Sequence, residues 1–118
     1  RGTYSFKSHR IDLGRGSEVR DCRNALIRTN DVAFAETSAP VNRSVSRQHS
    51  HIALDEESNQ FRLHDDGSVH GTRIVRRGRT LPVPFGSRGV RLQSGDEIVL
   101  GEARLRVKLL QAPETSDF

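Results

Sequence analysis

Apolar and polar residues alternate along most of this chain. The clearest case is the segment 103–109, in which four apolar residues alternate with three basic ones. An alternation of period two is typical of a β-strand with one buried face. By the same pattern the sequence predicts further short strands at Tyr4–Phe6, Ile11–Leu13, Ala25–Arg28, Val32–Ala35, His51–Leu54, Gln60–Leu63, Arg73–Val75, Val90–Leu92 and Glu97–Leu100.

Clusters of turn-forming residues separate these segments. They are Asn30-Asp31, Glu57-Ser58-Asn59, Asp65-Asp66-Gly67, Arg77-Gly78 and Ser94-Gly95-Asp96. No segment of the sequence shows a sustained helical period with caps, so the pattern predicts an all-β fold, an antiparallel β-sandwich of two twisted sheets. Two polar stretches, Gly16–Arg23 and Glu36–Val45, are expected to be long loops.

The length of 118 residues suits one domain with a single core. We expect this domain to span residues 1–110, followed by a flexible tail or linker at 111–118, where Pro113 and acidic residues replace the alternation. The chain begins at Arg1 and has no Met, so we expect it to be a piece of a longer protein. The sequence has neither an apolar run long enough to span a bilayer nor a signal segment, which predicts no membrane role. Its one cysteine, Cys22, cannot form an internal disulfide and favours a reducing, cytoplasmic setting.

The positive charge of the chain comes mostly from arginine. The 19 basic residues exceed the 15 acidic ones, which gives a net charge of +4, and only Lys7 and Lys108 are lysines. The guanidinium group is a planar fork that binds phosphate with two hydrogen bonds, so this composition favours a surface that binds phosphate groups. Composition alone supports nucleic-acid binding equally well. The basic block at 73–79 either extends such a surface or forms a solvated strand edge.

Four short motifs follow one another along these strands and turns. They are Gly14-Arg15, Ser46-Arg47-Gln48-His49, Ser68-Val69-His70-Gly71-Thr72 and Gly95-Asp96-Glu97-Ile98-Val99-Leu100-Gly101. In this order, and on an all-β chain, they resemble the forkhead-associated (FHA) domain over roughly Tyr4 to Leu109. The resemblance implies a β-sandwich whose loops at one end bind phosphothreonine peptides.

The resemblance also assigns roles to the motif residues. It implies that Arg15 and Ser46 hold the phosphate, and that Arg47 makes an additional phosphate or peptide contact unless it is only a surface arginine. His49 is expected to fix its loop through hydrogen bonds to the backbone. Structural support of the site is further expected from turns and hydroxyl groups at Gly14, Ser68, Gly71 and Thr72.

One position departs from the family pattern. The family usually has asparagine before Gly-Thr, where its amide holds the peptide backbone beside the phosphothreonine, and this chain has His70. A neutral imidazole still donates with one nitrogen and accepts with the other, although with a different reach. We expect phosphopeptide binding to be retained but altered, because Arg15 and Ser46 remain. The alternative is the same fold with a degenerate peptide site that binds a protein partner independently of phosphorylation.

The sequence gives less support to other kinds of site. Ser46 with His49 resembles a nucleophile and its base, but no carboxylate or oxyanion arrangement can be placed around them, so we expect no enzyme. His49 and His51 point to one face of a strand, as in a two-histidine metal clamp, but no third ligand has the required spacing. We therefore expect neither a metal nor a cofactor. Nucleic-acid binding is disfavoured, because one Tyr and no Trp offer little base stacking.

These inferences define the expected partner. The domain is expected to be an interaction module in signalling, and its partner a threonine-phosphorylated protein that is the substrate of a serine/threonine kinase. The tail adds a second hypothesis, because Thr115 is followed three residues later by Phe118. Once phosphorylated, Thr115 would dock into a neighbouring copy and allow self-association.

Overall fold

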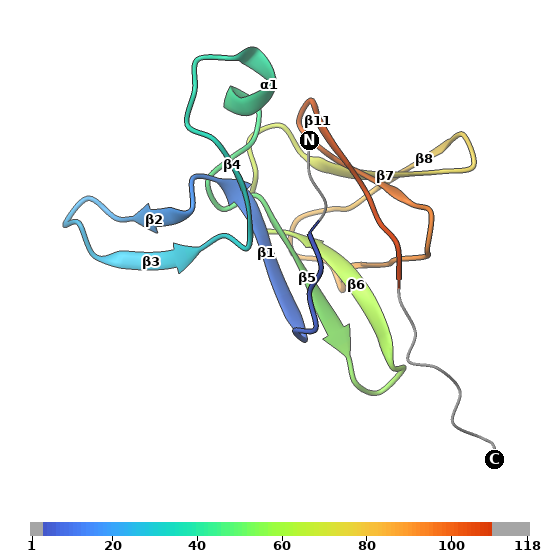
Figure 1. Cartoon of the computed structure of the whole chain (residues 1–118). Coiled ribbons are helices and arrows are strands. Elements are labelled where there is room, and N and C mark those ends of the chain that lie inside the picture. The colour runs from blue at the N-terminus through green and yellow to red at the C-terminus, as the bar shows by residue number, and fades with distance from the viewer. Residues whose placement is uncertain (1–3, 110–118) are drawn as a thin grey trace.

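The structure is a computed structural model that describes residues 4–109. Within these residues the chain forms eleven strands and one short helix (Figure 1). In chain order the elements are β1 (Arg10–Arg15), β2 (Glu18–Arg20), β3 (Leu26–Thr29), β4 (Val32–Phe34), α1 (Pro40–Arg43), β5 (Ser50–Asp55), β6 (Gln60–Asp65), β7 (Thr72–Arg76), β8 (Arg79–Pro82), β9 (Val90–Arg91), β10 (Glu97–Leu100) and β11 (Ala103–Arg106). No helix in residues 4–109 has the length and apolar character needed to cross a membrane. The predicted tail, with Thr115, lies outside the described residues, so the domain boundary at residue 110 stays a prediction.

The strands form two main sheets and a separate hairpin. The first sheet has the order β4-β1-β5-β6-β9, the second has the order β11-β10-β7-β8, and β2 pairs with β3. Strands of both sheets contribute side chains to one apolar core. Its buried members are Leu13, Val32, Val45, Leu63, Ile74, Val83, Leu92, Ile98, Leu100 and Ala103. The predicted all-β sandwich of two sheets is therefore confirmed.

The pairing of β1 with β4 departs from the expected antiparallel arrangement. These two strands run parallel, with Leu13 opposite Val32, whereas the other pairs in both sheets are antiparallel. Parallel neighbours need a crossover of a dozen or more residues. Residues 16–31 supply that crossover, and they carry the β2–β3 hairpin, which projects sideways from the sandwich (Figure 1).

Three predicted segments differ in the structure. Gly16–Arg23 is not all loop, because Val19 is buried and its strand β2 pairs with β3. Glu36–Val45 contains α1, which Pro40 opens at its first turn, and four residues are too few to show a helical period in the sequence. Tyr4–Phe6 forms no strand, since a short alternating segment also needs a partner strand, and within residues 4–109 it has none.

The predicted turn at Arg77-Gly78 is confirmed. It joins β7 to β8 with two residues, and Arg76 pairs with Arg79 across it. Both turn residues have positive φ, 51° for Arg77 and 77° for Gly78. Positive φ at both positions is the geometry whose twist matches a two-residue hairpin, and glycine adopts it without steric cost.

The strand pairing brings the segments that carry the motifs to one end of the sandwich. Ser50 at the start of β5 lies opposite Asp65 at the end of β6, so the segments 46–49 and 66–71 share that end. Ser50 also lies opposite Leu13 of β1, which brings Arg15 to the same place. Helix α1 lies over this end of the first sheet (Figure 1). We call it the recognition end.

Stability of the sandwich is expected to depend on Leu63, which is fully buried in the core. We predict that Leu63→Ala lowers the free energy of unfolding by about 2–5 kcal/mol, because it leaves a cavity in the core. The matched control is Leu26→Ala on β3, where the side chain is 48% exposed. Its effect should stay below about 0.5 kcal/mol. Urea unfolding measures both changes, and equal losses would contradict the core described above.

Candidate functional site

Backbone hydrogen bonds hold the segments of the recognition end together. The N–H of Arg15, the last residue of β1, donates to the carbonyl oxygen of Ser46 at 3.0 Å. The N–H of Val69, in the loop between β6 and β7, donates to the Ser46 hydroxyl oxygen at 3.0 Å. Three segments that are far apart in the sequence therefore meet at Ser46, and they include the predicted phosphate ligands Arg15 and Ser46.

Gly14 allows β1 to approach the loop before β5. A Cβ atom at this position would collide with the carbonyl group of Arg47 and would lie 2.8 Å from the Asn30 side-chain nitrogen. Any side chain would therefore push the Arg47 backbone away from β1. The glycine of the Gly14-Arg15 motif is explained by this close approach of two backbones.

Asn30 fixes the same region from the other side. Its side-chain nitrogen donates to the carbonyl oxygens of Gly16, at 2.8 Å, and Arg47, at 2.9 Å. Its side-chain oxygen accepts a hydrogen bond from Arg28 at 2.9 Å. Asn30 is buried and ties the two segments that carry Arg15 and Arg47. The sequence predicts only a turn at Asn30, because the partners of its side chain are distant in the sequence.

His49 connects two loops through its buried ring. The N–H of Ser46 donates to Nδ1 at 2.9 Å, so Nδ1 carries no proton. Nε2 lies 2.9 Å from the carbonyl oxygen of Gly71 and must donate to it. The neutral tautomer with its proton on Nε2 satisfies both contacts. Burial lowers the pKa of His49, against a smaller opposing effect of the bond to Gly71, and so favours that neutral ring.

Asp65 organises the loop between β6 and β7. Its carboxylate accepts hydrogen bonds from the hydroxyl groups of Ser68, at 2.5 Å, and Thr72, at 2.6 Å, and from the N–H of Gly67 and Ser68. The Ser68 hydroxyl also accepts from the Gly71 N–H at 2.9 Å, which closes the turn. Burial would raise the pKa of Asp65, but these hydrogen bonds outweigh it and hold the pKa below its usual value. Asp65 therefore stays charged. The sequence predicts only a turn at this position.

Arg15 and Arg47 both face the carboxylate of Glu36, which lies between β4 and α1. Arg47 donates from Nε to Oε2 at 2.9 Å and from Nη2 to Oε1 at 3.4 Å. Arg15 Nε lies 3.5 Å from Oε1. The hydrogen bond from Arg47, together with the charges of both arginines, lowers the pKa of Glu36. The sequence placed Glu36 at the edge of a predicted loop, and nothing in its local pattern indicated these partners.

A shallow groove lies along the loop between β6 and β7, and Val69, which bonds to Ser46, is part of its lining. Its lining includes His70 together with the apolar residues Val69, Pro82, Pro84 and Phe85. His70 is exposed, and Val69 and Phe85 are 82% and 71% exposed. Predicted site residues Ser68, Gly71 and Thr72 line the groove as well. The recognition end therefore combines a charged cluster with a partly apolar surface.

The histidines of β5 and β6 have other partners. His51 Nδ1 lies 2.7 Å from Asp66 Oδ1, and its ring stacks on His64 with centroids 4.5 Å apart. Arg28 donates to the other oxygen of Asp66 at 2.8 Å. Within residues 4–109, no group of three or more His, Cys, Asp or Glu side chains is placed to hold a metal ion.

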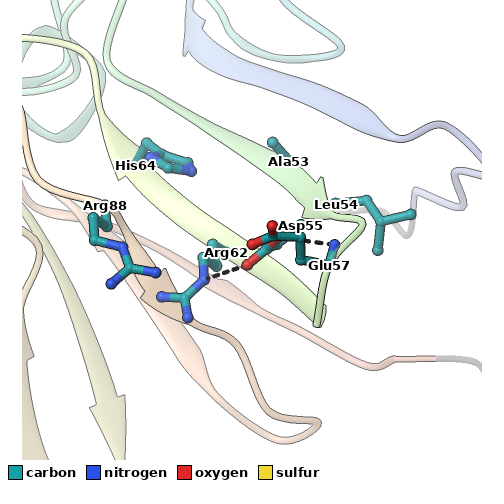
Figure 2. A pocket seen from close by; sticks show the side chains of 7 residues that line it. All are labelled: Ala53, Leu54, Asp55, Glu57, Arg62, His64 and Arg88. Atoms are coloured by element: carbon teal, nitrogen blue, oxygen red, sulfur yellow. Dashed lines mark hydrogen bonds and ion pairs between the residues drawn. The ribbon is translucent and has the colours of Figure 1, made fainter. Parts of the chain in front are cut away.

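A second hollow lies on the β5–β6 hairpin toward its turn, and Figure 2 shows the side chains around it. They belong to Ala53, Leu54, Asp55, Glu57, Arg62, His64 and Arg88. Arg62 donates to Asp55 at 3.3 Å and to the carbonyl oxygen of Gly89 at 3.2 Å. None of the residues that the motifs single out lines this hollow. It is separate from the recognition end.

Comparison with known proteins identifies the family. The profile of the FHA domain matches residues 11–101. The chain belongs to the FHA domain family. FHA domains are interaction modules that bind phosphorylated peptides, and the resemblance of the motifs is thereby confirmed. A search of curated proteins found no match.

Solved structures share the fold of this chain. An FHA domain of a hypothetical protein from Arabidopsis thaliana is 24% identical, with a TM-score of 0.58 over 91% of this chain and 72% of that one. The FhaA FHA domain, solved in complex with the intracellular domain of Rv3910, is 22% identical, with a TM-score of 0.53 over 86% and 81%. Full-length yeast Pml1p is 21% identical, with a TM-score of 0.56 over 82% and 57%. At these identities the similarity establishes the fold.

The lowered pKa of His49 makes stability depend on pH. In the unfolded chain His49 has the ordinary histidine pKa of about 6.5, so it takes up a proton more readily there than in the folded domain. The stability that neutral His49 contributes is therefore complete above about pH 6.5 and is lost as the pH falls through the folded-state pKa. We predict that His49→Ala lowers the free energy of unfolding at neutral pH by about 2–4 kcal/mol, because it leaves a cavity and an unpaired Ser46 N–H.

Urea unfolding between about pH 7.5 and 5 tests this prediction. The stability of the wild type should fall with pH more steeply than that of His49→Ala. His64→Ala is the comparison variant. It removes another histidine of lowered pKa, so its slope should also be flatter, but it leaves the two bonds of His49 in place and should lower stability at neutral pH less than His49→Ala does. The same slope in wild type and His49→Ala would contradict the assigned tautomer.

Proposed function

We propose that this FHA domain binds a threonine-phosphorylated segment of a partner protein and catalyses no reaction. Arg15 and Ser46 hold the phosphate, and Arg47 and His70 contact the surrounding peptide. The position of Glu36 carries this proposal, because one carboxylate lies within ion-pair distance of both Arg15 and Arg47. An anion can therefore contact both guanidinium groups at once. A phosphate group offers more charge and more acceptor oxygens than a carboxylate for the same place.

The arrangement of Ser46 supports this role. Its hydroxyl oxygen accepts a hydrogen bond from Val69, while its N–H and carbonyl group are bonded to His49 and Arg15. The hydroxyl keeps its own proton for donation to a phosphate oxygen. Because three bonds already fix the residue, little further order has to be imposed when a ligand binds.

The groove beside this cluster supports a peptide rather than a free phosphate as the ligand. Exposed Val69 and Phe85 offer apolar contact to side chains that flank the phosphothreonine, and His70 offers hydrogen bonds to the peptide backbone. A related FHA domain, that of FhaA, forms a complex with a protein partner. This precedent supports a protein ligand here.

The state of His49 supports a non-catalytic role. Both of its ring nitrogens are engaged, Nδ1 by the Ser46 N–H and Nε2 by the Gly71 carbonyl oxygen. A general base needs a free nitrogen within hydrogen-bond reach of the hydroxyl that it activates. His49 instead acts on the backbone of Ser46.

We predict that Arg15→Ala and Ser46→Ala each weaken phosphopeptide binding. Loss of a hydrogen bond to a charged group costs about 1.5–3 kcal/mol, which corresponds to an affinity loss of about 10- to 100-fold. Fluorescence anisotropy of a peptide selected from an oriented phosphothreonine library measures the change. Matched controls are Arg104→Ala on β11 and Ser58→Ala in the β5–β6 turn, which should bind as the wild type does.

The same titration with the unphosphorylated peptide separates the alternatives. Equal binding of both peptide forms, unaffected by Arg15→Ala, would support phosphorylation-independent recognition instead. Binding of DNA or RNA with a steep salt dependence would support a nucleic-acid ligand.

His70 is predicted to contribute to peptide affinity through hydrogen bonds to the peptide backbone. His70→Ala should weaken binding of the phosphopeptide by about three- to tenfold, because it removes one or two such bonds. His70→Asn should retain binding, because an amide also supplies a donor and an acceptor. His9→Ala, at an exposed position outside the recognition segments, is the control. Unchanged affinity in His70→Ala would show that the peptide does not contact this residue.

A further inference from the structure

Glu36 occupies the place that the proposed function gives to the phosphate. Its carboxylate accepts two hydrogen bonds from Arg47 and lies 3.5 Å from Arg15 Nε. In the proposed function these same two arginines face the ligand. The free domain therefore already holds an anion of its own at the site.

The position of this carboxylate is set by the backbone around it. Gly16, which follows Arg15, donates its N–H to the carbonyl oxygen of Phe34 at 2.8 Å, so the segment leading to Glu36 is fixed beside the end of β1. A Cβ atom at Gly16 would lie 2.9 Å from Glu36 Oε2, so a side chain there would require the end of the Glu36 side chain to shift. The lack of a side chain at position 16 leaves the Glu36 carboxylate undisturbed beside the arginine pair.

The internal ion pair satisfies the two arginines unequally. Arg47 has hydrogen-bond geometry to Glu36, whereas the Nε of Arg15 is buried and has no hydrogen-bond partner within residues 4–109. The planar Glu36 carboxylate bonds to Arg47 and leaves the Arg15 Nε–H without a hydrogen bond in the described part of the chain. A tetrahedral phosphate has more acceptor oxygens and can serve both groups. A buried N–H without a partner favours a ligand that supplies one.

Charge adds a second reason for exchange rather than joint binding. Glu36 is charged at neutral pH, since its two arginine neighbours lower its pKa. A phosphate dianion beside it would repel the carboxylate, so the two anions cannot share the arginine pair without cost. The Glu36 side chain is 45% exposed, so its carboxylate can turn out into water.

We propose that Glu36 is an internal competitor for the phosphate site, which a phosphopeptide must displace from Arg15 and Arg47 when it binds. This inference rests on the proposed function. It implies that the affinity for a phosphopeptide is lowered by the fraction of molecules in which Glu36 holds the arginines. It also names a residue that sets affinity and that lies outside the family motifs.

Glu36→Gln tests the competitor directly, because the amide keeps the size of the side chain and removes its charge. Exposed ion pairs are individually weak, so the loss of two should tighten phosphopeptide binding by only about three- to tenfold. The matched control is Glu97→Gln, which removes the same charge and another ion pair to arginine, with Arg104 at 2.7 Å in the other sheet. Glu97→Gln should bind the phosphopeptide with the same affinity as the wild type. Fluorescence anisotropy of the library-selected phosphothreonine peptide measures all three proteins.

Each outcome of this titration has one meaning. Weaker binding by Glu36→Gln would show that Glu36 positions the arginines for the ligand, and equal binding would show that it does not compete. Either result would overturn the competitor while the proposed function stands. If Glu97→Gln tightened phosphopeptide binding as much as Glu36→Gln does, the effect would come from net charge alone, and the competitor role of Glu36 would be overturned.

Inorganic phosphate separates this inference from a failure of the proposed function. If no peptide binds in a phosphorylation-dependent way, the proposed function fails. The binding of inorganic phosphate to the wild type and to Glu36→Gln is then measured through the Arg15 Nε–H resonance in nitrogen-15 NMR spectra. The competitor predicts about three- to tenfold tighter phosphate binding in the variant. No response of Arg15 in either protein would overturn it.

Discussion

The buried ring of His49 holds the recognition end together. It accepts a hydrogen bond from the Ser46 N–H, ahead of β5 in one sheet, and donates one to the Gly71 carbonyl oxygen, ahead of β7 in the other. Only a neutral imidazole with its proton on Nε2 makes both bonds. One side chain therefore couples the two sheets, and the protonation state of that side chain couples stability to the geometry of the loops.

The rest of the recognition end follows from this bridge. Once Gly71 is tied to His49, the turn before it is closed by Ser68, whose hydroxyl group also bonds to Asp65. Thr72 then reaches the same carboxylate, and the Ser50 hydroxyl lies 2.6 Å from that of Thr72 across the two sheets. The polar groups of these loops are thus bonded before any ligand arrives. Loops that are fixed in advance lose less conformational entropy on binding, which favours recognition by few contacts.

Local signals in the sequence predicted much of this architecture. The alternation at 103–109 and the turn at Arg77-Gly78 follow from local geometry, and the order of the four motifs pointed to the family. Contacts between distant segments could not be read from the chain. Asn30 reaches the carbonyl oxygen of Arg47 only because β1 and the loop before β5 are packed together at Gly14. The parallel pairing of β1 with β4 depends in the same way on a crossover. The sequence predicted the second strand of this crossover at Ala25–Arg28, but the first, β2, has only three residues and was not predicted.

Glu36 changes how the charge of this surface should be understood. The net charge of +4 suggests a surface open to any anion, yet at the recognition end two arginines already share a carboxylate. In the proposed exchange, a phosphate replaces this carboxylate, so affinity depends on the difference between two sets of contacts rather than on positive charge alone. The contact left incomplete in the free domain is at Arg15 Nε, which is buried and unpaired within residues 4–109. Selectivity for phosphate would then arise from geometry at Arg15, because an anion that merely copies the carboxylate of Glu36 gains nothing by replacing it.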